Sequence, residues 1–235
     1  MTTLFQTKII NSYIIKLFLS FCLLAFSYIS PILAQKDSVN SSNYLLIINS
    51  YTEAAPWSFR MISAITEYAQ NSPQLALYTE HMNMLMMDTD STLNEFRQTV
   101  LEKYKQHSPR MLILLGNSSM ILRDDFRKMW GNIPIILCAE EDYIGPKEFY
   151  LQKKPVELTA RTPIADMAQP YNLTFLHSNF YIKENIDLIC RMTPDIKNFI
   201  FIGDERQNNQ TYNMVIKQEL KKSHPNINYQ FISMS

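Results

Sequence analysis

Glycine is scarce in this sequence: its 235 residues include only 4, where average usage would supply about 16. The four are Gly116, Gly131, Gly145 and Gly203, and they are widely spaced along the chain. Neither a P-loop nor a G-x-G-x-x-G turn can be written from them, because both motifs need glycines close together. Nucleotide binding through either phosphate-binding motif is therefore excluded.

The charge balance disfavours another class of partner. The chain carries 22 basic and 22 acidic side chains, so it has no excess of positive charge to attract the phosphates of nucleic acid. Charged residues make up 19% of the sequence and hydrophobic residues 46%, which is typical of a folded protein. We therefore expect a globular protein with no nucleic-acid partner.

Cysteine and histidine are also few. The three cysteines are Cys22, Cys138 and Cys190, and neither they nor the 4 histidines form a C-x-x-C or H-E-x-x-H motif. We expect no bound metal and no cofactor. In an oxidising compartment Cys138 and Cys190 could pair, but their apolar neighbours favour two buried free thiols.

The N-terminal segment, residues 1–34, has the pattern of a secretory signal peptide. Lys8 and Lys16 are its only charges, and a largely apolar stretch follows over residues 17–33 up to the small residue Ala34. The alternative is an uncleaved inner-membrane anchor, since this stretch is at the lower limit for spanning a bilayer. We predict cleavage and an exported, periplasmic protein.

Residues 43–142 alternate between two hydrophobic periods. Short apolar runs predict strands, and segments with apolar residues at helical spacing follow them. The strands are expected over 44–48, 75–78, 111–115 and 133–138, with helices that begin near Pro56, near a cap at Ser91 or Thr92, and near Ser119. This rhythm predicts an α/β fold, with a parallel sheet and helices on both faces. We expect it to form the first of two lobes.

Residues 143–179 break the rhythm, with four prolines and no sustained period, and predict a crossover between the lobes. The rhythm resumes over 180–235, where a helix, a strand, a second helix and a further strand are expected. One such unit leaves apolar sheet surface uncovered. We therefore expect an incomplete second lobe, completed by a partner or by sequence that this chain lacks.

Several segments, in order, resemble a known family. Residues 45–57, Leu-Leu-Ile-Ile-Asn-Ser-Tyr-Thr-Glu-Ala-Ala-Pro-Trp, resemble the opening of periplasmic substrate-binding proteins of ABC transporters. They resemble more closely the sensor regions of hybrid two-component histidine kinases from Bacteroides-like bacteria, in which a Pro-Trp pair opens the helix after the first strand. Residues 110–116 and 133–138 look like the next strands of that family, and residues 181–203 look like the beginning of its second lobe.

The resemblance covers almost all of residues 43–235 and implies a periplasmic-binding-protein-like fold. It implies an extracytoplasmic sensor module that binds a small molecule between two lobes and has no catalytic activity of its own. A membrane-anchored signalling or permease protein, or a second copy of the chain, would be its partner. In that family the second lobe continues past the position of Ser235, and a membrane helix and a kinase core follow, so this chain would correspond to a fragment.

Three loops that follow strands carry the candidate ligand-binding residues, because ligands of open α/β sheets bind beyond the carboxyl ends of the strands. The first loop offers Ser50, Tyr51 and Trp57. The rings of Tyr51 and Trp57 could stack on an organic ligand, although both rings could simply pack against the start of the helix. In the second, Asn117 and Ser118 open a helix whose N-terminus favours an anionic or hydroxylated group. Ordinary capping by these two residues is the alternative.

The third loop is the acidic run Glu140-Glu141-Asp142, in which we select Glu140 and Asp142 as candidates. Such carboxylates could bind a cation, accept sugar hydroxyls or pair with basic groups of the second lobe, although solvated surface charge is the usual role. Residues 203–205 of the second lobe would meet these loops on closure.

Residues 81–87 contain one histidine and four methionines, a pattern compatible with Cu(I), but methionines that fill gaps in a core are far commoner. In an extended segment Met82, Met84 and Met86 would share one face. Two alternatives to a kinase sensor remain. One is a free-standing ABC-transporter binding protein, and the other is a periplasmic hydrolase that would use residues such as Ser118 and His177.

Overall fold

The computed structural model describes residues 43–72 and 74–234. The predicted signal peptide, with Cys22, lies outside these residues. Within the part of the chain that is described, no helix has the length and apolar character needed to cross a membrane.

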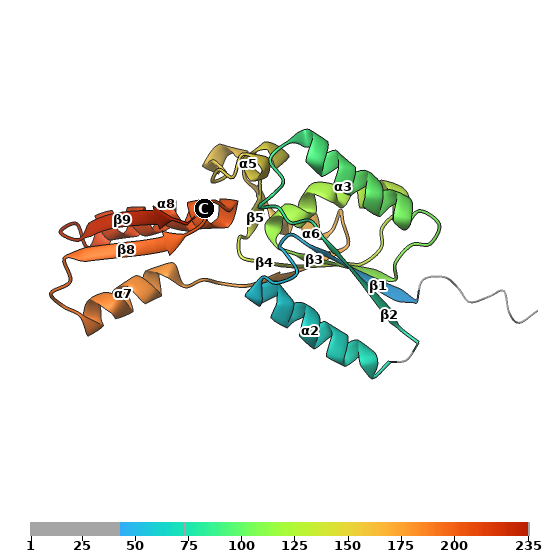
Figure 1. Cartoon of the computed structure of the whole chain (residues 1–235), viewed down its shortest axis with the longest axis horizontal. Coiled ribbons are helices and arrows are strands. Elements are labelled where there is room, and N and C mark those ends of the chain that lie inside the picture. Colours follow the sequence, from blue (N-terminus) through green and yellow to red (C-terminus); the bar gives the residue numbers. More distant parts are fainter. Residues whose placement is uncertain (1–42, 73, 235) are drawn as a thin grey trace, which may run out of the picture. The chain divides into compact units, whose positions relative to one another are not determined.

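A five-stranded parallel sheet forms the centre of the first lobe (Figure 1), with strand order β2-β1-β3-β4-β7. Its strands are β1 (Tyr44–Asn49), β2 (Ala76–His81), β3 (Met111–Leu115), β4 (Ile135–Ala139) and β7 (Leu173–His177). The three central strands β1, β3 and β4 are almost entirely buried, which explains their unbroken apolar runs. The predicted α/β fold is therefore confirmed.

Helices cover both faces of this sheet (Figure 1). On one face, α2 (Pro56–Gln70) packs Trp57, Met61, Ile62 and Ile65 against Ile47, Ile113, Leu115 and Cys138. The other face holds the larger core, to which α3 (Asp90–Lys103), α4 (Arg123–Trp130), α5 (Lys147–Leu151) and α6 (Ile164–Ala168) contribute. Alternate residues of each central strand thus point into different clusters, as the pleat requires.

Two predicted helix starts were wrong. The cap of α3 is Thr89, whose hydroxyl accepts a hydrogen bond from the Thr92 N–H at 3.2 Å, and not Ser91 or Thr92. The segment after β3 begins as a 3-10 helix, η1 (Asn117–Leu122), before α4, and Gly116 precedes it with φ +87°. The N-cap of this 3-10 helix is Gly116, so neither Asn117 nor Ser118 caps it, and the Asn117 amide is engaged with another loop.

The segment predicted as a crossover, residues 143–179, contains regular structure. It includes a short antiparallel pair, β5 (Tyr143–Ile144) with β6 (Thr162–Pro163), the 3-10 turn η2 (Leu158–Ala160), and the helices α5 and α6. It also supplies β7, which pairs with β4 and extends the first sheet. β7 was not predicted from the sequence because this edge strand is mostly exposed and therefore lacks an unbroken apolar run.

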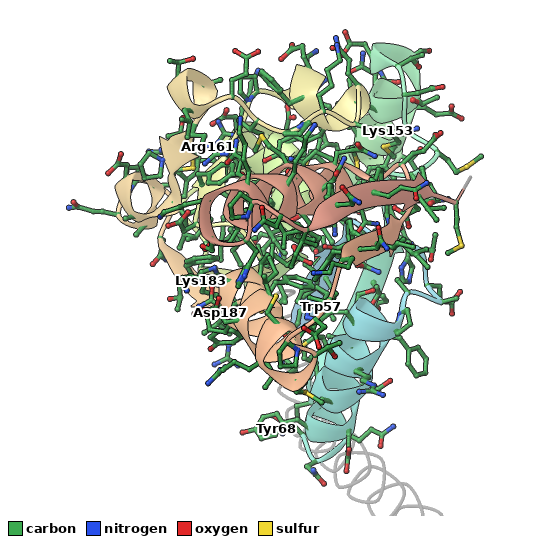
Figure 2. The ribbon with its side chains drawn as sticks, turned by 90° about the vertical axis from the view of Figure 1, so that its left-hand side faces the viewer. Trp57, Tyr68, Lys153, Arg161, Lys183 and Asp187 are labelled. Carbon is green, nitrogen blue, oxygen red and sulfur yellow. The ribbon has the colours of Figure 1, made fainter. Side chains whose placement is uncertain are left out.

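The second lobe consists of α7 (Ile182–Met192), β8 (Asn198–Gly203), α8 (Gln207–Ser223) and β9 (Asn228–Ser233), with β8 and β9 parallel. Figure 2 shows Lys183 and Asp187 close together on α7, where the ammonium lies 2.5 Å from the carboxylate. One face of the strand pair packs on the helices through Phe199, Phe201 and Tyr229. The opposite face exposes the apolar residues Ile200, Ile202 and Ile232.

Cys138 is buried in the first lobe and Cys190 is half-buried on α7 of the second lobe. Both are free thiols in the described structure. Burial raises the pKa of Cys138, which keeps its thiol protonated and unreactive.

Candidate functional site

A cavity of about 290 Å³ lies where the carboxyl ends of β1, β2, β3 and β4 face the end of β8. This is where an open α/β sheet binds ligands, and the volume suits a small organic molecule. The lining comes from both lobes. It comprises residues 50–52, 55, 56, 83–85, 117, 118, 140, 141, 150 and 153 of the first lobe, and 204 and 206–208 of the second.

The cavity brings together five of the seven predicted site residues: Ser50, Tyr51, Asn117, Ser118 and Glu140. Trp57 and Asp142 lie outside its lining. Trp57 packs in the core on the α2 side of the sheet, with its ring edge-on to Tyr51 and the two ring centroids 5.7 Å apart. Figure 2 shows Trp57 at the start of α2, apart from the cavity residue Lys153. The Asp142 side chain is exposed to solvent.

Tyr51 connects the first lobe with the second. Its hydroxyl donates a hydrogen bond to Glu140 Oε1 at 2.6 Å, and the Arg206 guanidinium of the second lobe lies 6.0 Å from its ring centroid. Burial, and then the neighbouring Glu140 carboxylate, raise the pKa of Tyr51 well above its usual value, so the phenol remains a donor. Burial also raises the pKa of Glu140, against the opposing effects of Tyr51 and Arg206.

Arg206 is held in place by Asp204. The Asp204 carboxylate accepts hydrogen bonds from the backbone N–H of Arg206 at 2.9 Å, from its Nε at 2.7 Å, and from Asn209 Nδ2 at 2.6 Å. Burial alone would raise the pKa of Asp204, but these hydrogen bonds lower it below its ordinary value. The lobe-two wall of the cavity is therefore a preformed ion pair on the turn before α8.

Asn117, predicted as a ligand contact, is used by the fold. Its Nδ2 donates to the carbonyl oxygens of Glu141 at 2.7 Å and Tyr143 at 2.9 Å, and its Oδ1 accepts from the Glu141 N–H at 3.2 Å. These bonds fasten the loop after β3 to the loop after β4. Only the edge of Asn117 remains to line the cavity, and the residue is 6% exposed.

Sequence reasoning missed Asn49, the last residue of β1, which is fully buried. Its side chain bonds to Ser58 Oγ at 3.3 Å and lies 2.9 Å from His81 Nδ1, and its Oδ1 accepts from the Tyr51 N–H at 3.2 Å. Asn49 thus fixes the turn that presents Tyr51 to the cavity. The available signal was a polar residue that ends a run of buried apolar ones.

Glu141 is the other missed residue, because Asp142 was selected from the acidic run in its place. Glu141 is only 8% exposed, and neither carboxylate oxygen accepts a hydrogen bond from the described residues. Burial raises its pKa to about 7, although the nearby hydroxyls of Tyr143 and Thr211 act in the opposite direction. An acidic group of this kind near neutral pH is typical of functional sites.

This burial predicts a dependence of stability on pH. Since the pKa of Glu141 is about 7 in the folded state and 4.5 ordinarily, the folded state binds its proton more tightly. The free energy of unfolding should therefore decrease by about 3 kcal/mol between about pH 4.5 and pH 7 through this group. Urea denaturation at both pH values should show that Glu141→Gln removes most of this decrease. An unchanged decrease in the variant would contradict the assignment.

The methionines after β2 belong mostly to the core. Met82 and Met87 are buried and Met84 packs beside them, whereas Met86 is 70% exposed. The expected common face of Met82, Met84 and Met86 does not form, because the chain turns at Asn83, whose φ is +50°. Over the described ranges, no group of three or more His, Cys, Asp or Glu side chains is placed to hold a metal ion.

The fold and the cavity define this chain as an α/β protein with a small-molecule-sized cavity between two lobes. No protein-family model matches the chain, and no curated protein sequence matches it.

The solved structures that are similar to the chain include the following two. One, described as a LacI transcriptional regulator from Bacteroides fragilis, is 12% identical with a TM-score of 0.47, over 81% of this chain and 59% of that one. The other, a conserved domain protein from Vibrio cholerae, is 10% identical with a TM-score of 0.49, over 82% of this chain and 57% of that one. The chain thus spans less than two thirds of either protein. At these values neither structure assigns a ligand or an activity to this chain.

Proposed function

We propose that this chain is a module that binds a small organic ligand in the cavity between its two lobes. The observation that carries the proposal is the lining of the cavity, which combines loops after four parallel strands of the first lobe with the turn after β8 of the second. A ligand held there contacts both lobes at once. Its binding energy therefore favours the arrangement in which the lobes are closed on it.

The closure would bend the segment that joins the lobes, residues 178–181. This segment lies between β7 and α7, outside both sheets, and Tyr181 at its end has a left-handed backbone with φ +48°. Few residues need to change conformation for such a hinge to move. The Arg206 and Tyr51 pair lies on opposite sides of this movement, so it would form or separate as the lobes close or open.

In the finer proposal, the module is exported and is the sensor part of a two-component histidine kinase, as the resemblance of residues 45–57 and 181–203 implies. Closure would then shift the signalling equilibrium of the kinase by the difference in ligand affinity between the two states. A free-standing transport binding protein is the alternative. A hydrolase has less support, since His177 lies outside the cavity lining and its Nε2 is 2.9 Å from the Glu140 carbonyl oxygen.

A thermal-shift screen of small organic molecules against residues 35–235 tests the binding proposal. We expect ligands present at about 100 times their Kd to stabilise the protein by about 2.7 kcal/mol, which raises Tm by several degrees. Arg206→Ala should reduce the shift for those ligands, because it removes the basic side chain of the lobe-two wall of the cavity.

Arg191→Ala is the matched control, because Arg191 is exposed on α7 of the same lobe and lies outside the cavity lining. It should leave the shifts unchanged. Failure of a broad library to stabilise the folded wild-type protein, or shifts that are equal in both variants, would count against a ligand in this cavity.

A further inference from the structure

Glu141 has an unusual place in the cavity wall. It is one of the most buried charged side chains in the described chain. Neither of its carboxylate oxygens accepts a hydrogen bond of good geometry there, although the hydroxyls of Tyr143 and Thr211 lie near enough to lower its pKa. The Thr211 hydroxyl donates its own hydrogen bond to the Gln207 carbonyl instead. A carboxylate removed from water is costly unless a donor or a cation compensates it. The fold retains this group at a position that lines the cavity, where a ligand can supply the compensation.

No cation among the described residues forms an ion pair with Glu141, although the charge of Arg161 acts to lower its pKa. The titratable and charged groups around it, on the loops, on α5 and on α8, are Glu140, Tyr143, Tyr150, Arg161 and Tyr212. The one cation in this set, Arg161 (labelled in Figure 2), stacks 3.9 Å from the Tyr143 ring centroid, and its Nε donates to the Val156 carbonyl. Lys153 also lines the cavity but does not reach the Glu141 oxygens.

The other charged side chains of the cavity do not occupy the carboxylate oxygens of Glu141 or Glu140 Oε2 either. Arg206 is occupied by Asp204, and Tyr51 uses only Oε1 of the Glu140 carboxylate. The acceptors without a hydrogen-bond partner among the described residues are thus Glu140 Oε2 and the two Glu141 oxygens, which are buried in the cavity wall, so that a ligand must displace the side chains around them to reach them. Although many lining residues are polar, most of the surface that the lining exposes is apolar, and Pro56, Met84 and Leu85 are among its members.

We propose that the ligand carries a protonated amine on an apolar or ring-shaped body, and that Glu141, assisted by Glu140, accepts the hydrogen bonds of this ammonium group. The inference rests on the proposed function and names its ligand class. An ammonium group has three donors and a full positive charge, which matches the carboxylates of two consecutive acidic residues in the cavity wall. A neutral hydroxyl in the same place could donate only one hydrogen bond.

Calorimetric titration of residues 35–235 with matched pairs of probes tests this inference. The pairs are cyclohexylamine with cyclohexanol, phenethylamine with phenethyl alcohol, and glucosamine with glucose. We expect at least one amine to bind about ten-fold or more tightly than its alcohol. For cyclohexylamine and phenethylamine, whose amines stay protonated up to about pH 8, binding near neutral pH should release protons. Their affinity should rise between about pH 6 and pH 8, because the amine binds the ionised form of Glu141.

Two variants locate the effect. Glu141→Gln keeps the shape of the side chain and should bring the amine close to parity with its alcohol, whereas Glu140→Gln should weaken the preference only in part. Glu148→Gln removes the same charge from the exposed surface of α5 and should leave the preference unchanged. Should Glu141→Gln fail to fold, the proton release by the wild-type protein and the effect of Glu140→Gln still test the inference.

Alcohols that bind as tightly as their amines, an affinity of cyclohexylamine or phenethylamine that falls between about pH 6 and pH 8, or an amine preference unchanged in Glu141→Gln would each overturn the inference. These results differ from a failure of the proposed function. If neutral or anionic molecules bind in a manner that depends on Arg206 while amines show no advantage, the cavity binds a ligand of another class. If the library and all six probes fail to bind, the proposed function itself is contradicted.

Discussion

Alanine at position 116 is expected to lower the free energy of unfolding by roughly 2–5 kcal/mol. Gly116 has φ +87°, a backbone conformation that disfavours any residue with a Cβ atom. An added Cβ would also lie 2.9 Å from Ser50 Oγ and 3.0 Å from Tyr51 Cε2. Because both contacts belong to the cavity wall, ligand affinity should fall together with stability. Chemical denaturation and ligand titration would measure the two effects.

Gly131→Ala is the matched control for this substitution. Gly131 also has a positive φ, of +72°, but an added Cβ would meet no atom within 4 Å. The control therefore carries the backbone strain without the close contacts, and should cost about 1–2 kcal/mol without changing ligand affinity. Equal losses in both variants would show that the contacts with Ser50 and Tyr51 contribute nothing.

Removal of the Asn117 amide is expected to cost roughly 2–4 kcal/mol. In Asn117→Ala the carbonyl groups of Glu141 and Tyr143 and the N–H of Glu141 would lose their partners in a buried position. The loop after β4 would then no longer be fixed, and Glu141 would lose its orientation in the cavity. Urea denaturation gives the loss of stability, and thermal shift with a cavity ligand gives the loss of binding.

Ser118→Ala is the control for Asn117→Ala, because it changes a residue of the same loop that lines the cavity without removing the hydrogen bonds of Asn117. Ser118 is half-buried and lines the cavity beside Asn117. Its substitution should change the free energy of unfolding by less than about 0.5 kcal/mol, as is usual away from buried polar networks. If Asn117→Ala proves as mild as Ser118→Ala, the hydrogen bonds of Asn117 are not what holds this loop.

The central strands were predictable because burial on both faces requires an unbroken run of apolar residues in the sequence. Residues 44–48 and 111–115 are runs of apolar residues, and both form interior strands of the first sheet. The helix after Pro56 was equally clear, since its apolar residues recur at the spacing of one helical face. In each case a single local pattern fixes the element.

Where structure depends on distant partners, the sequence was less informative. β7 is recognisable only by its pairing with β4, and the 3-10 turn η1 follows from the backbone of Gly116 and the anchoring of Asn117 to another loop. The candidate site likewise contains residues that local sequence predicts and residues that only distant contacts position. Residues at strand ends, such as Ser50 and Tyr51, could be placed in the cavity from topology alone.

Which of the acidic residues line the cavity could not be read from the run Glu140-Glu141-Asp142, of which the structure places Glu140 and Glu141 there. The choice depends on how the loop after β4 turns, and that turn is set by the Asn117 hydrogen bonds and by packing against α8. The role of Arg206 was hidden for a similar reason, because its pairing with Asp204 and its approach to Tyr51 require the second lobe to be folded beside the first.

The two lobes have cores of very different size, and this has a kinetic consequence. The main cluster of the first lobe contains twenty-two buried hydrophobic residues, whereas that of the second lobe contains four: Ile186, Tyr212, Ile216 and Leu220. Local opening is easiest where few apolar contacts must be broken. Amide hydrogens of β8 and α8 should therefore exchange with solvent faster than those of β1 and β3, and a cavity ligand would slow them by tethering the weaker lobe to the stronger one.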